Sequence, residues 1–184
     1  MRRVLGVLIA LIGVLLIAGA LVVRFVVAPQ AIKAPIEDGD DPYTATTVAT
    51  GDASLLNQEN GQLVPNVPVR AERTITADVD ASTDDVAVWD VEVVTTNEAN
   101  GAEISSTTDR VAFDRETSEA VAGFDEAVNG ESVSHEGTIS YKFPFDTQQQ
   151  TYDYFDTTTG QGWPAEFQDT EDVEGLETYR FEQA

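Results

Sequence analysis

The feature that most restricts this chain is a run of twenty residues without a polar side chain, Val4–Val23. Twenty helical residues extend about 30 Å, which matches the hydrocarbon thickness of a membrane. Arg2 and Arg3 precede the run, and Arg24 follows it. Because basic residues favour the cytoplasmic side, we expect residues 1–27 to form a cytoplasmic start and a transmembrane anchor, with the bulk of the chain outside the cell membrane.

A cleaved signal peptide is the alternative interpretation of this segment. Ala18-Gly19-Ala20 has the small-x-small form of a cleavage site. Cleavage there would leave the apolar residues Leu21–Val23 and Phe25–Val27 exposed at the new terminus. We therefore favour a retained anchor.

One stripe of the expected helix carries small residues. Gly6, Ala10, Gly13 and Ala20 follow one another at spacings of 4, 3 and 7 positions. Small residues let a second helix approach closely, so this stripe is a candidate packing face for a homo-oligomer or a protein partner. The general abundance of Gly and Ala in membrane helices is the simpler explanation.

The charge of the chain lies outside the apolar run. The formal net charge is -23, and the residues after Val27 include seven basic and 33 acidic side chains, or -26. Such a domain is repelled by nucleic acid and by anionic lipid headgroups, so we expect neither as a partner. The chain has no cysteine, which excludes disulfides, thiolate metal sites and a cysteine nucleophile.

The remaining sequence predicts a mainly β domain. Residues 28–42 hold three prolines and a cluster of acids, which indicates a linker. From Tyr43, apolar and polar residues alternate, although Arg73 interrupts the apolar side of one strand and suggests a bulge. Asn-Gly pairs at 60–61, 100–101 and 129–130 indicate turns. We expect residues 43–184 to form an extracytoplasmic, acidic antiparallel meander, as a curved sheet or partial barrel.

Aromatic residues concentrate near the end of the chain. Ten of the fifteen fall between positions 141 and 181, so this part should supply an aromatic core. The alternation of Tyr141, Phe143 and Phe145 predicts a strand. A curved sheet could also enclose a lipid-like ligand. The candidate wall consists of Tyr141, Phe143, Tyr152, Tyr154, Trp163, Tyr179 and Phe181. Ordinary core packing is the simpler explanation.

The sequence contains no recognisable catalytic pattern. The single histidine, His135, lies in a Ser-His-Glu-Gly segment that predicts an exposed turn. There is no Gly-x-Ser-x-Gly nucleophile elbow. The acidic clusters at 38–41 and 78–85 lack the spacing of a calcium loop. We therefore expect neither an enzyme nor a metal or cofactor site.

Several motifs resemble those of a known family. They are the start with Arg24–Pro29, and the segments Asp84–Asp90, Asp109–Arg115, His135–Gly137, Tyr141–Phe145, Thr151–Asp156 and Gly175–Phe181. Over nearly its whole length the chain resembles the actinobacterial porin PorA family, which consists of membrane-anchored envelope proteins. The resemblance implies longer relatives that end in a second membrane helix. Because this chain stops at Ala184, directly after a predicted strand, we expect it to be the N-terminal part of such a protein.

These observations favour one function and leave two alternatives. We expect a single-pass, noncatalytic envelope protein whose β domain serves interaction or structure. The first alternative is a carrier or sensor of a lipid-like apolar ligand. The second is an oligomeric pore component.

Overall fold

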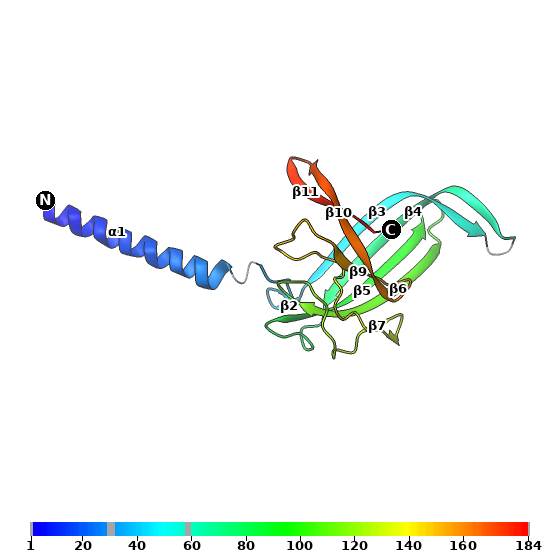
Figure 1. Cartoon of the computed structure of the whole chain (residues 1–184), viewed down its shortest axis with the longest axis horizontal. Helices are drawn as coiled ribbons and strands as arrows, with labels where there is room; N and C mark the ends of the chain where they lie inside the picture. The colour runs from blue at the N-terminus through cyan, green and yellow to red at the C-terminus, as the bar shows by residue number, and fades with distance from the viewer. Residues whose placement is uncertain (1, 29–31, 58–59, 184) are drawn as a thin grey trace. The chain divides into compact units, whose positions relative to one another are not determined.

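The chain divides into two units, Met1–Lys33 and Ala34–Ala184. The computed structural model describes residues 2–28, 32–57 and 60–183 (Figure 1). Side chains are described from Ile12 onward, apart from those of Val26 and Asn57 and the gaps in the described ranges.

The first unit is helical. The helix α1 spans Arg2–Val22 and continues into a single π-helical turn, Val23–Val27. The described part of the chain contains no helix that is both long enough and apolar enough to cross a membrane. The expected span at Val4–Val23 is therefore not confirmed. Gly13 and Ala20 of the candidate packing face lie on α1, whereas the side chains at positions 6 and 10 lie outside the described residues.

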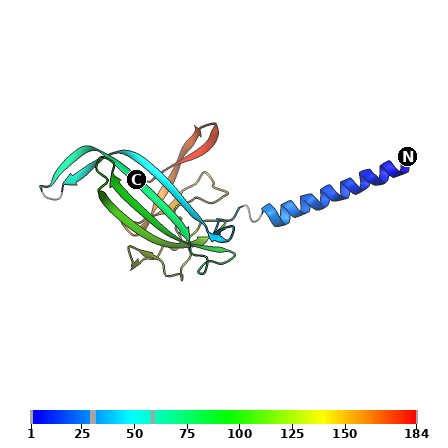
Figure 2. The same ribbon diagram turned by 180° about the vertical axis from the view of Figure 1, so that it is seen from behind.

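The second unit contains a six-stranded antiparallel sheet in the order β3-β4-β5-β6-β7-β8, so sequential strands are neighbours (Figure 2). This order confirms the predicted meander. Each Asn-Gly pair lies at a turn, and Gly61, Gly101 and Gly130 have φ values of 68°, 72° and 79°. The strands are β3 (Thr44–Asn57), β4 (Gln62–Ala77), β5 (Val86–Asn97), β6 (Glu103–Asp114), β7 (Ala127–Val128) and β8 (Glu131–Ser132).

A three-stranded sheet lies against one face of the large sheet (Figures 1 and 2). Its order is β11-β10-β9, with β9 at Tyr152–Asp156, β10 at Gln161–Val173 and β11 at Leu176–Gln183. Isolated bridges connect it to β6. Phe113 pairs with Ala120, Glu119 with Ile139, and Ile139 with Tyr154. Strand-like pairing therefore continues from β6 to β9, and the two sheets face each other.

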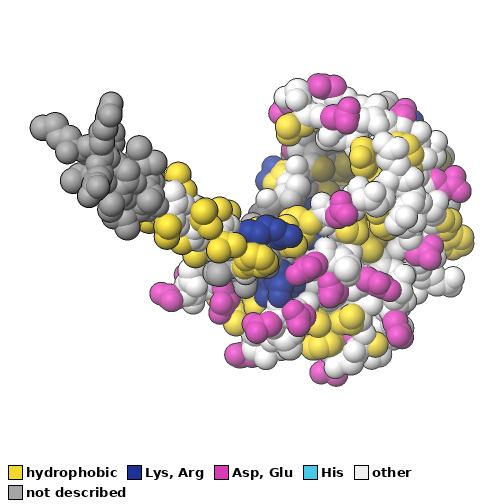
Figure 3. Space-filling model, turned by 60° about the vertical axis from the view of Figure 1, so that its left-hand side comes forward, with side chains coloured by type: hydrophobic (Ala, Val, Ile, Leu, Met, Phe, Trp, Pro, Cys, Tyr) yellow, Lys and Arg dark blue, Asp and Glu magenta, His cyan; other side chains and the backbone are white. Residues whose placement is uncertain are grey.

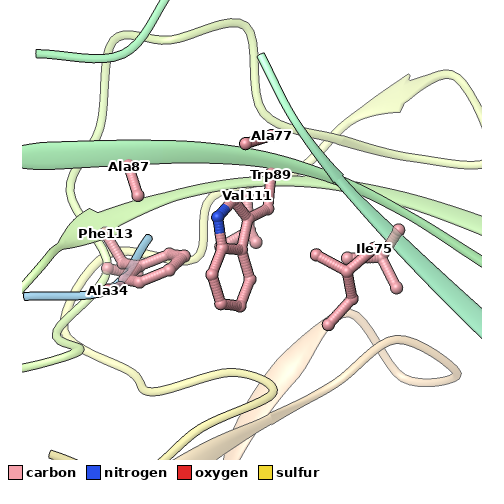
Figure 4. Packing of buried hydrophobic residues seen from close by; sticks show 9 residues of the cluster. Ala34, Ile75, Ala77, Ala87, Trp89, Val111 and Phe113 are labelled. Carbon is pink, nitrogen blue, oxygen red and sulfur yellow. The ribbon is translucent and has the colours of Figure 1, made fainter. Parts of the chain in front are cut away.

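The core lies at one end of the inner face of the large sheet and centres on Trp89 (Figure 4). The Trp89 ring meets Phe113 edge-on at 4.8 Å and stacks on Tyr43 at 5.9 Å. Its indole Nε1 donates a hydrogen bond of 3.1 Å to the carbonyl of Pro35. A buried indole needs such an acceptor, so this bond attaches the segment before β3 to the core.

The segment before β3 is more ordered than its composition predicts. Ala34 is completely buried, and Arg115 donates a 2.7 Å hydrogen bond to its carbonyl. Two short strands, β1 (Glu37–Asp38) and β2 (Asp41–Pro42), form a hairpin. Proline and acid content predicted a linker over 28–42, but the core residues provide the partners that order its second half.

Two local predictions are wrong. Arg73 lies in a regular part of β4, paired with Thr47 and Val93, and the register shifts occur elsewhere. The expected strand at Tyr141–Phe145 does not form. Tyr141 has a φ of 58°, in the left-handed region, which is incompatible with a continuing strand.

We predict that Trp89→Ala lowers the free energy of unfolding by about 3–5 kcal/mol, because it leaves a cavity and removes the contact with Pro35. Trp163 is a matched control because its side chain is 41% exposed. Trp163→Ala should cost about 1 kcal/mol or less. Urea unfolding of both variants tests this, and equal losses would contradict the assignment of Trp89 to the core.

Candidate ligand-binding cavity

A cavity of about 500 Å³ lies between the inner face of the large sheet and β9. The space-filling view shows a hollow in the β unit with apolar side chains in its floor (Figure 3). The cavity volume is within the range of roughly 300–1,000 Å³ typical of small-molecule sites. The lining residues come from β3 to β6, from positions 140–141, from β9 and its following turn, and from β11.

The strand register determines where the core ends and the cavity begins. Side chains on one face of a sheet recur every second residue, so paired strands form rows across that face. The row of Ala77, Trp89 and Val111 is apolar and buried. Two rows further along the strands, the equivalent positions are Thr47, Arg73, Val93 and Thr107. A row with polar side chains cannot extend the apolar core, and all four line the cavity.

Arg73 provides a cation in the cavity wall. Its guanidinium carbon lies 5.8 Å from the centre of the Tyr141 ring. Its Nε is buried and has no hydrogen-bond partner among the described residues. A buried polar atom without a partner costs free energy, so this donor is suited to a group that enters the cavity.

Asp109 connects the sheet to the segment that contributes Ser140 and Tyr141 to the cavity wall. This residue of β6 is 3% exposed. One carboxylate oxygen lies 2.9 Å from Nε2 of His135, and the other accepts a 2.5 Å hydrogen bond from the Tyr141 hydroxyl. Burial and the negative charge of Asp109 raise the pKa of Tyr141. The phenol therefore keeps its proton and remains a donor to Asp109.

His135 is a buried residue and not the exposed turn residue that the sequence predicts. Its side chain is fully buried and packs against Phe155, with ring centres 3.9 Å apart. The reason is the Asp109 carboxylate, which offers a buried partner that local sequence does not reveal. The other ring nitrogen, Nδ1, is buried without a partner in the described part of the chain.

Ser140 adds a third unsatisfied polar atom to this region. The residue is 4% exposed, lines the cavity, and its Oγ has no hydrogen-bond partner among residues 2–28, 32–57 and 60–183. Ser140 Oγ and His135 Nδ1 are thus not bonded to each other. The pair lacks the hydrogen bond that activates a serine nucleophile.

The proposed aromatic wall divides into three groups. Tyr141 and Tyr154 line the cavity. Phe143, Tyr152 and Phe181 form an adjoining cluster, in which the Phe143 and Phe181 rings stack at 4.5 Å. Trp163 and Tyr179 lie at the surface with exposed fractions of 41% and 40%. The three-stranded sheet and the irregular segment before β9 therefore bring five of the seven aromatic residues together.

The polar residues of the cavity were missed by sequence reasoning. Asp109 alternates with Val111 and Phe113, which indicates a charged residue on a buried face. Arg73 interrupts the apolar face of β4 in the same way. A charged residue on the apolar face of a strand was therefore the sequence signal that could have located Asp109 and Arg73. Ser140 has no such pattern because it lies outside a regular strand.

The acidic clusters do not assemble a metal site in the described part of the chain, where no group of three potential ligands meets. Asp78 forms a 2.7 Å ion pair with Arg110 instead. Hydrogen bonding to Arg110 lowers the pKa of Asp78.

A comparison with known families gives a match over residues 5–184 to the family described as Porin PorA. The chain belongs to this family. A protein named Porin PorA from Corynebacterium resistens is 34% identical over 92 residues, which cover 44% of this chain and 22% of that protein. The match thus spans about a fifth of that relative's length. Membership of the PorA family implies a location in the cell envelope.

We predict an alkaline loss of stability that depends on Tyr141. Its folded-state pKa lies above that of the unfolded chain, which is about 10. The stabilisation is therefore complete below about pH 10 and is lost as the pH rises further. Urea unfolding between about pH 8 and 11 should show a shallower decline for Tyr141→Phe than for the wild type. Tyr179→Phe, at a surface position, is the control; an unchanged slope in Tyr141→Phe would contradict the assignment.

Proposed function

We propose that this chain is a noncatalytic, membrane-anchored envelope protein whose β unit holds a lipid-like ligand in the cavity beside Arg73. The observation that carries the proposal is a cavity with two lining residues, Arg73 and Ser140, whose buried polar atoms have no partner among the described residues. These atoms are Arg73 Nε and Ser140 Oγ. Native proteins rarely leave such atoms without partners, and a bound molecule would satisfy those that face the cavity.

The walls support a ligand that is largely apolar. Ala49, Ala71 and Val93 lie on the sheet side, while Tyr154 and Phe155 lie on the β9 side. A cavity with apolar walls and a few placed polar groups is the usual form of a small-molecule site. The amino-acid sequence favours a module for interaction or structure. The cavity, by contrast, favours a carrier or sensor of a lipid-like ligand.

The geometry of the polar groups supports a noncatalytic role. A covalent mechanism needs a nucleophile within hydrogen-bond reach of its base. Among the described residues, His135 Nδ1 and Ser140 Oγ have no hydrogen-bond partner, and Nε2 of His135 is occupied by Asp109. His135 therefore helps to position Asp109, and Ser140 is the member of the pair that lines the cavity.

We predict that the protein purified from its host carries a ligand. Native mass spectrometry before and after organic extraction should show an extra mass that extraction removes. Ala49→Trp should abolish it, because the new ring would fill the cavity from β3. Val48→Trp is the matched control, since Val48 is exposed on the opposite face of the same strand. A clean apo mass for the wild type would overturn the proposal.

The anchor and the side of the membrane are part of this proposal. The apolar run Val4–Val23 supports the anchor, and Arg2 and Arg3 support an extracytoplasmic β unit. From Ile12 onward, the described apolar side chains of α1 are exposed, for example Leu15 at 72%. Lipid would cover them favourably.

The word porin in the family's description favours a second candidate, an oligomeric pore component. Reconstitution into membranes tests the anchor and the pore together. We expect the full chain to float with liposomes and to resist carbonate extraction, while deletion of residues 4–23 abolishes flotation. We expect no conductance steps in a planar bilayer. Release by carbonate would contradict the anchor, and reproducible steps would favour the pore.

A further inference from the structure

Arg73 differs from the other four arginines of the β unit. Within the described residues, each of the other four has a polar partner. Arg70 pairs with Glu72, Arg110 with Asp78 and Asp90, Arg180 with Asp169, and Arg115 with backbone carbonyls of Ala34 and Asp84. For Arg73, the described residues offer the rings of Tyr141 and Tyr154 as neighbours but no hydrogen-bonded or ion-paired acid. A cation without a carboxylate is unexpected in a region that carries a charge of -26 after Val27.

The acids in the cavity wall are already engaged by other donors. Asp109 accepts hydrogen bonds at both oxygens, from His135 and Tyr141. Asp156 accepts bonds from the backbone N–H of Thr158 and from the hydroxyl of Thr159. Neither carboxylate is hydrogen-bonded to Arg73, so the guanidinium donors have no hydrogen-bonded acid among the described residues, although Asp109 and Asp156 also line the cavity.

A second unsatisfied donor lies in the same wall. Ser140 lines the cavity, and its buried hydroxyl has no partner among the described residues. A guanidinium offers a planar fork of N–H donors that matches the geometry of a carboxylate or phosphate. Together with a hydroxyl donor, the fork forms a receptor for an anion.

We propose that the ligand is an anionic amphiphile, with a carboxylate or phosphate head on Arg73 and Ser140 and a hydrocarbon tail along Val93, Tyr154 and Phe155. This inference rests on the proposed function of the same cavity and adds the chemical class of the head group. The anion replaces the missing partner of Arg73. The apolar side chains beside it remove the tail from water.

The test compares amphiphiles that share a tail and differ in the head. The full chain, freed of lipid and placed in nanodiscs of zwitterionic lipid, is titrated with dodecanoate, dodecanol and dodecyltrimethylammonium, with empty nanodiscs as background. We expect dodecanoate to bind about 10- to 100-fold more tightly than dodecanol, as for hydrogen bonds to a charged group. The cationic amphiphile should bind more weakly than dodecanol.

Variants assign the preference to its residues. Arg73→Gln should remove the preference for dodecanoate and leave the binding of dodecanol unchanged. Arg70→Gln is the matched control, because Arg70 lies on the same strand and forms an exposed pair with Glu72. Arg73→Lys keeps the charge without the fork and should retain part of the preference. Ser140→Ala should weaken dodecanoate binding by about 3- to 10-fold. Urea unfolding of each variant establishes that it folds.

The outcomes separate the two proposals. If none of the amphiphiles binds, the proposed function fails together with the inference. If dodecanoate and dodecanol bind equally, and Arg73→Gln changes nothing, the inference fails and the proposed function stands. If inorganic phosphate displaces dodecanoate at equal concentration, the site binds a free anion, and the inference that the ligand is an amphiphile is overturned.

Discussion

The register of the antiparallel strands β3 to β6 is the constraint on which the rest of the β unit depends. It aligns inward-facing side chains in rows, and the composition of each row decides what can form there. Apolar rows around Trp89 and Phe113 make the core. The row that contains Arg73 cannot be packed in the same way, so the inner face opens into a cavity.

The boundary between core and cavity is held by Asp109. It shares a row with Ile75 and Val91, both buried and apolar, and so places a carboxylate at the edge of the core. Its bonds to His135 and Tyr141 fasten the segment between β8 and β9, whose residues are otherwise irregular. One buried acid thereby positions the Tyr141 ring in the cavity wall and the buried His135 ring beside it. Removing one partner from such a network leaves the others buried without a hydrogen bond, which lowers the stability of the fold.

Much of the fold could be predicted from local pattern, but little of the site could. Alternation located β4 and β5, and Asn-Gly pairs located three turns, because these signals depend on neighbouring residues alone. Tyr141–Phe145 also alternates but is no strand, because the bond from Tyr141 to Asp109 and its left-handed backbone override the pattern. The burial of His135 could not be predicted for a related reason, because its partner Asp109 lies 26 positions away in the sequence.

The amino-acid sequence by itself determined the apolar N-terminal run, the acidic character of the remainder, the antiparallel meander and the family resemblance. These properties follow from composition and short-range periodicity. Only the tertiary structure decided that Arg73, Asp109, Ser140 and Tyr141 surround one cavity, and that His135 is buried behind Asp109. The physical reason is that strand register and the crossing of β9 bring together residues from distant positions, and burial then determines which polar atoms find partners and which remain available to a ligand.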